Sequence, residues 1–191
     1  MPLNPLAQMQ KSIVLVGLMG SGKSSIGRRL ATRLGLPFKD ADAEVEAAAG
    51  CSIDEIFSRY GEAAFRDGER RVIRRLLSEP PHVLATGGGA FMDPDTRDLI
   101  RAQGVSVWLR ADLDLLVART SRRNHRPLLK NADPREVLSQ LIEVRYPIYA
   151  ESDVVVDTDD SPQDVMVERV IAGLRRYLAE KGAGTAEGDP P

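Results

Sequence analysis

The sequence predicts an α/β fold built on a parallel β-sheet. Five short runs rich in β-branched and apolar residues alternate with longer stretches of helical periodicity. Strands separated by helices form parallel sheets, because each helix returns the chain to the same edge of the sheet. The expected strands are residues 13–16, a short strand near residue 38, and residues 83–86, 105–109 and 154–156.

Capping residues mark where several helices begin. Asp93, Asp133 and Ser161 each precede a proline, and proline suits the first helical position because its missing N–H is not needed there. An earlier helix begins near Lys23 and ends at Gly35. The last helix is expected to pack on the sheet through apolar residues at helical spacing, which are Val167, Val170, Ile171, Leu174 and Leu178.

The composition is typical of one globular domain in a reducing compartment. The 191 residues are 42% hydrophobic and carry a net charge of −2, which favours neither nucleic-acid nor membrane-surface binding. We expect one domain over residues 11–180, with disordered tails at 1–10 and 181–191, where apolar residues are few. The single cysteine, Cys51, and the lack of a signal-peptide or membrane-spanning pattern predict a cytoplasmic protein.

Residues 17–24, with the sequence GLMGSGKS, form a complete phosphate-binding loop between the first expected strand and the helix that follows. The glycines let backbone N–H groups face the phosphates, and the helix N-terminus attracts negative charge. Lys23 is placed to reach the β- and γ-phosphates, and Ser24 supplies a hydroxyl for Mg²⁺. We therefore predict an ATP-binding site with a Mg²⁺ cofactor, formed by Gly20, Ser21, Gly22, Lys23, Ser24 and Ser25.

Missing motifs narrow the class of nucleotide-binding protein. The Asp-x-x-Gly and Asn-Lys-x-Asp motifs of switch GTPases do not occur, and strand 83–86 runs into glycine instead of ending in a metal-binding aspartate. Asp40 and Asp42 are the remaining source of a carboxylate. Because they lie two residues apart at a strand end, they project to the same side, so one can face a metal ion and the other an acceptor hydroxyl.

The segment 119–130 is strongly basic and contains no acid. A nucleic-acid-binding patch is the competing interpretation, but the segment has no aromatic residue on which a base could stack. We favour a mobile lid, about residues 121–131, that closes over ATP, since phosphoryl transfer requires positive charge and exclusion of water. The basic residues are Arg119, Arg122, Arg123, Arg126 and Lys130.

Together these motifs resemble those of shikimate kinases over roughly residues 12–178. After the phosphate loop, the matching segments are 38–42 (FKDAD), 52–57 (SIDEIF), 61–69 (GEAAFRDGE), 86–89 (TGGG), 126–129 (RPLL) and 145–149 (RYPIY). The resemblance implies a P-loop kinase of the nucleoside-monophosphate-kinase-like branch, with three α/β/α layers and strand order 2-3-1-4-5. It also implies transfer of the ATP γ-phosphoryl group to the 3-hydroxyl of shikimate, toward aromatic amino acids; we expect a monomer.

The resemblance assigns roles to individual residues. Arg66 and Arg145 correspond to the arginines that bind the shikimate carboxylate, which suits planar guanidinium donors. Glu69, one helical turn after Arg66, can orient it. The expected substrate-binding residues are Asp42, Arg66, Gly87, Gly88, Gly89 and Arg145, where the glycines let a ligand approach the backbone.

The remaining assignments concern catalysis and the nucleotide. Lys23, Asp42 and Arg126 are the expected catalytic residues, with Arg119 and Arg126 on ATP and with Ser24 and Asp40 on the metal. Asp42 either accepts the hydroxyl proton or only orients the hydroxyl, because a loose transition state needs little base assistance.

Two alternatives remain open. One is another small-molecule kinase of the same fold, for gluconate or a nucleoside monophosphate. The other is a nucleotide-binding module without catalysis, which the presence of Asp40, Asp42 and Arg126 disfavours.

Overall fold

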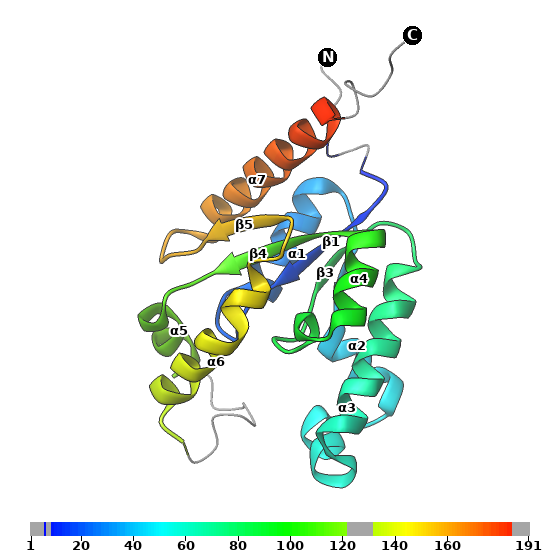
Figure 1. Ribbon diagram of the computed structural model, residues 1–191, viewed down its shortest axis with the longest axis vertical. Coiled ribbons are helices and arrows are strands. Elements are labelled where there is room, and N and C mark those ends of the chain that lie inside the picture. The colour runs from blue at the N-terminus through cyan, green and yellow to red at the C-terminus, as the bar shows by residue number, and fades with distance from the viewer. Residues whose placement is uncertain (1–5, 7–8, 122–131, 185–191) are drawn as a thin grey trace.

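The computed structural model describes residue 6 and residues 9–121 and 132–184, and over these it contains a five-stranded parallel sheet between two layers of helices (Figure 1). The strand order is β2-β3-β1-β4-β5, and all neighbouring strands are parallel. The predicted fold class and strand order are therefore confirmed. The strands are β1 (Ser12–Val16), β2 (Phe38–Asp40), β3 (Val83–Ala85), β4 (Gly104–Arg110) and β5 (Val154–Asp157).

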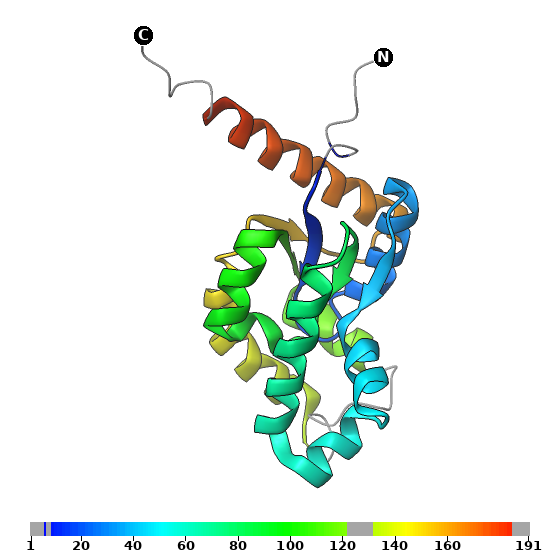
Figure 2. The same cartoon turned by 90° about the vertical axis from the view of Figure 1, so that its right-hand side faces the viewer.

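Two helices cover one face of the sheet and five cover the other within the described residues (Figures 1 and 2). The first face carries α1 (Lys23–Leu34) and α7 (Gln163–Gly184). The second carries α2 (Ala41–Ala49), α3 (Ile53–Leu77), α4 (Pro94–Gln103), α5 (Leu113–Thr120) and α6 (Pro134–Tyr149).

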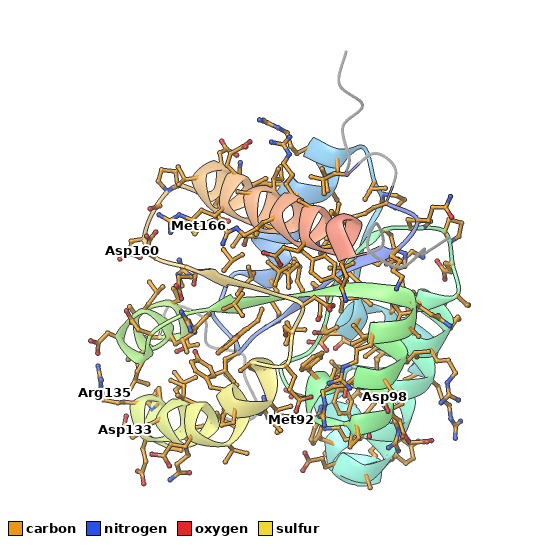
Figure 3. All side chains as sticks on the ribbon, turned by 45° about the horizontal axis from the view of Figure 1, so that its top comes forward. Met92, Asp98, Asp133, Arg135, Asp160 and Met166 are labelled. Carbon is orange, nitrogen blue, oxygen red and sulfur yellow. The ribbon has the colours of Figure 1, made fainter. Side chains whose placement is uncertain are left out.

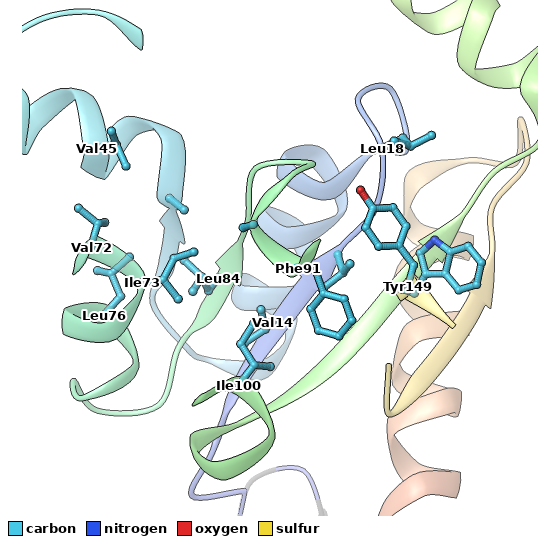
Figure 4. Close-up of a cluster of buried hydrophobic side chains, with 14 of the residues drawn as sticks. Val14, Leu18, Val45, Val72, Ile73, Leu76, Leu84, Phe91, Ile100 and Tyr149 are labelled. Carbon is cyan, nitrogen blue, oxygen red and sulfur yellow. The ribbon is translucent and has the colours of Figure 1, made fainter. Parts of the chain in front are cut away.

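Strand β1 lies in the middle of the sheet and is buried on both faces. Ile13 and Leu15 belong to the apolar cluster under α1 and α7, whereas Val14 and Val16 belong to the cluster on the opposite face. Figure 4 shows Val14 and Leu84 in that second cluster. Burial on both faces explains why the strand is a continuous apolar run.

Two of the three predicted helix starts match the structure. The Asp93 carboxylate accepts from Thr96 N at 2.9 Å and begins α4, and Asp133 accepts from Arg135 N at 3.0 Å and begins α6 (Figure 3). Helix α7 begins at Gln163, one residue later than predicted. The carbonyl of Pro162 accepts from the amide of Met166, so the proline itself precedes the first helical residue.

The described structure extends past the predicted domain bounds at both ends, through a buried residue before residue 11 and through further helix after residue 180. Leu6 is buried in the apolar cluster under α7, with Met9 packed beside it, because that face of the sheet needs further apolar cover. Helix α7 continues to Gly184, past the predicted limit at residue 180. The expected lid, with Arg126, falls on residues 122–131, which lie outside the described residues, as do residues 1–5, 7–8 and 185–191.

Helix α3 carries two expected site residues to the edge of the sheet. A capping box of Ser52 and Glu55 begins it, and Gly61, with a left-handed φ of 83°, divides it into two helices. The second of these presents Arg66 and Glu69 to the sheet. Along the part of the chain that the structure describes, no helix has the length and hydropathy needed to cross a membrane.

The contact between α1 and β2 allows a stability test. A Cβ at Gly27 would lie 2.7 Å from the Phe38 ring and 3.0 Å from Leu15 Cδ1. We expect Gly27→Ala to lower the free energy of unfolding, because overpacking costs about 1–3 kcal/mol and exceeds the helix-propensity gain of about 0.5–1 kcal/mol. Chemical denaturation measures this.

The matched control is Gly68→Ala in α3, because nothing lies within 4 Å of a Cβ at that position. This variant should be unchanged or slightly more stable. A loss of stability as large as that of Gly27→Ala would contradict the packing explanation.

Candidate active site

The site lies at the carboxyl edge of the parallel strands, around the phosphate-binding loop. The loop leaves β1 and enters α1 at Lys23, and Gly20 and Gly22 take left-handed φ values of 83° and 97° that only glycine adopts easily. Among the described residues, no side chain caps the N-terminus of α1. The first amides of the helix are thus available to bind an anion.

Two side chains of the loop complete the anion site. The ammonium of Lys23 donates to Gly17 O at 2.6 Å and to Leu18 O at 3.0 Å, so it is held against the loop backbone. The Ser21 hydroxyl is buried and has no hydrogen-bond partner among the described residues. A buried polar atom without a partner is costly, and a bound phosphate oxygen would satisfy it.

Ser24 and Asp40, the two expected metal ligands, are in direct contact. Ser24 Oγ donates to Asp40 Oδ2 at 2.9 Å, while Asp40 Oδ1 accepts from the amides of Asp42 and Ala43 at the start of α2. The cap therefore holds the second carboxylate oxygen toward Ser24.

This pair fits Mg²⁺, which takes one or two protein oxygens together with phosphates and water. Within the described residues no group of three or more His, Cys, Asp or Glu side chains could form a metal cage. The donors suit a metal ion that arrives with a nucleotide.

Asp42 lies beside the glycine segment that follows β3. A Cβ at Gly87 would lie 2.9 Å from Asp42 Oδ1 and 2.8 Å from Glu69 Oε1, so both carboxylates border this glycine. Asp42 is exposed to solvent, although nearby protein atoms displace part of the water around its carboxylate. This loss of hydration, followed by repulsion from Asp40, raises the pKa of Asp42, and Lys23 opposes the shift.

Glu69 is a buried partner of Arg66. It is 2% exposed, and its Oε2 accepts from Arg66 Nη1 at 2.9 Å, which confirms the predicted pairing. Its other oxygen has no hydrogen-bond partner among the described residues. Burial raises the pKa of Glu69, and the charge of Arg66 works against this rise.

Each of the other two glycines faces an arginine. A Cβ at Gly88 would lie 3.0 Å from Arg145 Nη1, and a Cβ at Gly89 would overlap the guanidinium of Arg66. In the sequence analysis, the three glycines are interpreted as positions where a ligand can approach the backbone. The structure adds that charged side chains of the protein itself occupy the space beside them.

A pocket of about 410 Å³ opens between α3, which contributes Arg66, and α6, which contributes Arg145. Arg66 and Arg145 provide its positive charge, while Val137, Leu141 and Val144 of α6 contribute apolar surface. Such a pocket suits a small organic anion, because the guanidinium groups can bind its acidic group while the α6 side chains contact its carbon skeleton.

Arg119 joins the phosphate loop to the turn before α7. Its guanidinium donates to Gly20 O at 3.2 Å and to Asp159 O at 2.7 Å. The Asp159 carboxylate accepts from Ser161 and Arg169, and these bonds lower its pKa to about 2. Figure 3 shows the neighbouring Asp160 in this turn.

Two expected site residues remain, Ser25 and Arg126. Ser25 lies, partly buried, in the first turn of α1. Arg126, the third expected catalytic residue, lies outside the described residues.

Sequence reasoning missed the role of Tyr149. Its hydroxyl donates to the carbonyl of Gly88, although the matching segment 145–149 was interpreted only through Arg145. The available signal was the spacing: residues four apart on a helix share one face, so Arg145 and Tyr149 both reach the glycine segment.

Comparisons with known proteins agree with this arrangement. The family profile described as shikimate kinase matches residues 19–175. The shikimate kinase of Paramagnetospirillum magneticum is 64% identical over 168 residues, which cover 88% of this chain and 86% of that protein. The structure of shikimate kinase from Acinetobacter baumannii in complex with shikimate superposes with a TM-score of 0.85 at 35% identity, covering 93% of this chain and 98% of that one.

A gluconokinase from Sinorhizobium meliloti is less similar. It has a TM-score of 0.58 and 26% identity, covering 93% of this chain and 98% of its own. The fold is shared, but the agreement in structure is weaker than for the shikimate kinase.

The raised pKa of Asp42 predicts that its charge destabilises the folded protein. When a carboxyl group has a higher pKa in the folded protein than in the unfolded chain, its protonation stabilises the fold. This contribution is complete at a pH below the unfolded-state pKa and is lost as the pH rises through the folded-state pKa. Asp42→Asn should therefore raise the Tm at neutral and alkaline pH, with a difference that disappears in acid. Thermal unfolding across a pH series measures this.

Asp98→Asn, at an exposed position on α4, is the control and should change the Tm little at any pH. A lower Tm for Asp42→Asn at alkaline pH would mean that its carboxylate is stabilised by the site.

Proposed function

The chain belongs to the shikimate kinase family and is an ATP-dependent phosphotransferase, and we propose that it transfers the γ-phosphoryl group of ATP to the 3-hydroxyl of shikimate. The observation that carries the proposal is the arrangement around residues 87–89. Arg66 and Arg145 face one end of this segment, while Asp42 faces the other. Shikimate has a carboxylate and ring hydroxyls, so its two kinds of polar group match the two ends.

The nucleotide end of the site is assigned to the phosphate loop. The amides of Gly20 and Gly22 and those of the first turn of α1, which includes Ser25, bind the phosphates together with the Ser21 hydroxyl. Lys23, held against the loop by Gly17 O and Leu18 O, stabilises the charge that develops on the transferring group. We assign Arg126 the same role of stabilising charge on the transferring group. For Arg126 this assignment rests on the family motif alone.

Ser24 and Asp40 are the residues that would hold Mg²⁺ with the nucleotide, and their direct contact supports this assignment. When bound, the metal ion neutralises phosphate charge and favours departure of ADP. The contribution of the protein is to hold two oxygen ligands together by capping α2 with Asp40.

At the acceptor end, Arg66 and Arg145 bind the carboxylate of shikimate and thereby fix the position of its ring. Asp42 accepts a hydrogen bond from the 3-hydroxyl. As the new oxygen–phosphorus bond forms and the bond to the ADP oxygen breaks, the hydroxyl proton passes to Asp42. Its raised pKa supports this role, because a carboxylate with a higher pKa is a stronger base.

Arg119 is the residue that we assign to the adenine. Arg119 contacts both the loop and the turn before α7, and this position supports a contact with the adenine. We further infer a cytoplasmic monomer, in keeping with a chain that has one cysteine and an ordinary net charge of −2.

An ADP-release assay with shikimate, gluconate and AMP as alternative acceptors tests the proposed substrate. We expect turnover with shikimate, because the two arginines can bind its carboxylate while Asp42 reaches a ring hydroxyl. Turnover with gluconate or AMP, and none with shikimate, would contradict the proposal.

Replacing Arg66 by lysine tests the acceptor assignment. The change keeps the charge but removes the planar donor pair, and loss of a charge-assisted hydrogen bond of about 1.5–3 kcal/mol should raise the KM for shikimate roughly 10- to 150-fold. The KM for ATP should change little. Steady-state kinetics with each substrate varied in turn provide the measurement.

Arg71→Lys on the same helix is the matched control, because the Arg71 side chain is 77% exposed and forms a surface ion pair with Asp67. It should have wild-type kinetics. Equal weakening of both substrates by Arg66→Lys would show that Arg66 does not bind the acceptor.

A further inference from the structure

Tyr149 is a fully buried residue at the C-terminus of α6, in an aromatic cluster behind the site. It is 0% exposed, and its ring centroid lies 5.9 Å from that of Trp108 and 6.4 Å from that of Phe91. Figure 4 shows Tyr149 and Phe91 in the buried apolar cluster to which Leu18 also belongs. A phenol buried in apolar surroundings needs a hydrogen-bond partner for its hydroxyl.

The partner of this hydroxyl is the carbonyl of Gly88, in the middle of the glycine segment. Gly88 lies between the two halves of the site, because a Cβ built on it would be 3.0 Å from Arg145 Nη1 and 3.6 Å from Gly17 O. Successive glycines have many accessible backbone conformations. An anchored carbonyl selects one orientation of the Gly88 peptide.

Arg145 lies one helical turn before Tyr149, so the two side chains extend from the same face of α6. Burial raises the pKa of Tyr149, so the phenol stays protonated and remains a donor to Gly88. The Arg145 guanidinium also lies close enough to the Tyr149 hydroxyl for its charge to oppose the rise in the pKa of that hydroxyl.

We propose that Tyr149 is a positioning residue for the acceptor substrate. Its hydroxyl fixes the Gly88 peptide against which the Arg145 guanidinium packs, and so holds Arg145 in the geometry that binds the substrate carboxylate. Tyr149 itself lies behind the glycine segment, and its effect is transmitted through Gly88 and Arg145. The inference rests on the proposed function for the identity of the acceptor.

Tyr146 provides a matched comparison on the same helix. Its hydroxyl also donates to a backbone carbonyl, that of Ala111, and its ring also packs on Trp108, with centroids 4.9 Å apart. Ala111 follows β4 and is not part of the glycine segment. Removing either hydroxyl deletes the same kind of bond, but only one of the two bonds reaches the acceptor site.

The test compares Tyr149→Phe with Tyr146→Phe in the full-length protein. Loss of one hydrogen bond predicts that Tyr149→Phe weakens shikimate binding roughly 3- to 13-fold, in both KM and calorimetric Kd. The KM for ATP and the affinity for a non-hydrolysable ATP analogue should stay within about twofold. Tyr146→Phe should lower the Tm to a similar degree and leave shikimate affinity unchanged.

An Arg145→Ala background shows whether Tyr149 acts through Arg145. If it does, Tyr149→Phe added to Arg145→Ala should weaken shikimate binding by less than about twofold further, because coupled residues are not additive. A full additional loss would overturn the proposed route.

A further variant separates the hydrogen bond from general stability. Replacement of Tyr149 by 4-aminophenylalanine keeps the ring and an N–H donor for Gly88, and shikimate affinity should stay within about threefold of wild type. This variant also tests the proposal if Tyr149→Phe does not fold. A folded 4-aminophenylalanine variant that binds shikimate tenfold or more weakly than the wild type would contradict the proposal.

Equal loss of shikimate and ATP affinity in Tyr149→Phe, or equal effects of the two tyrosine variants on shikimate, would overturn the inference. Failure of the proposed function has a different readout. In that case the wild-type protein releases no ADP with shikimate, which is established before any variant is made.

Discussion

The active site depends on the absence of side chains at Gly87, Gly88 and Gly89. This segment passes between two carboxylates and two guanidinium groups at the carboxyl edge of the sheet, and the space that a Cβ would need is occupied by their polar atoms. Because the charged groups pack directly against the backbone, the acceptor site lies next to the phosphate loop. Longer side chains in the segment would separate the two halves.

Two of the four charged groups around this segment, Arg66 and Glu69, form an ion pair with each other. Glu69 is buried and holds Arg66 at 2.9 Å, which restricts the guanidinium to one orientation. Asp42 has no such close cationic partner in the described residues, and dehydration together with Asp40 raises its pKa. In the proposed mechanism, these residues supply a fixed cation for the substrate carboxylate and a basic carboxylate for the substrate hydroxyl.

The fold and much of the site could be predicted because the relevant signals are local in sequence. The phosphate loop, the caps at Asp93 and Asp133 and the apolar run of β1 each depend on neighbouring residues. The role of Tyr149 could not be predicted in this way, because its partner Gly88 lies 61 positions earlier and meets it only through the packing of α6. The extension of the core to Leu6 likewise depends on a surface that forms only on folding.

Gly89→Ala tests the central claim most directly. Gly89 has φ −93° and ψ −11°, which alanine adopts without strain, so the added methyl group acts only by its contact with the Arg66 guanidinium. Calorimetry on the folded variant should show that shikimate binding is weakened roughly tenfold or more, as expected when a charge-assisted contact is displaced, while ATP-analogue binding is retained. Wild-type affinity for shikimate in this variant would contradict the account.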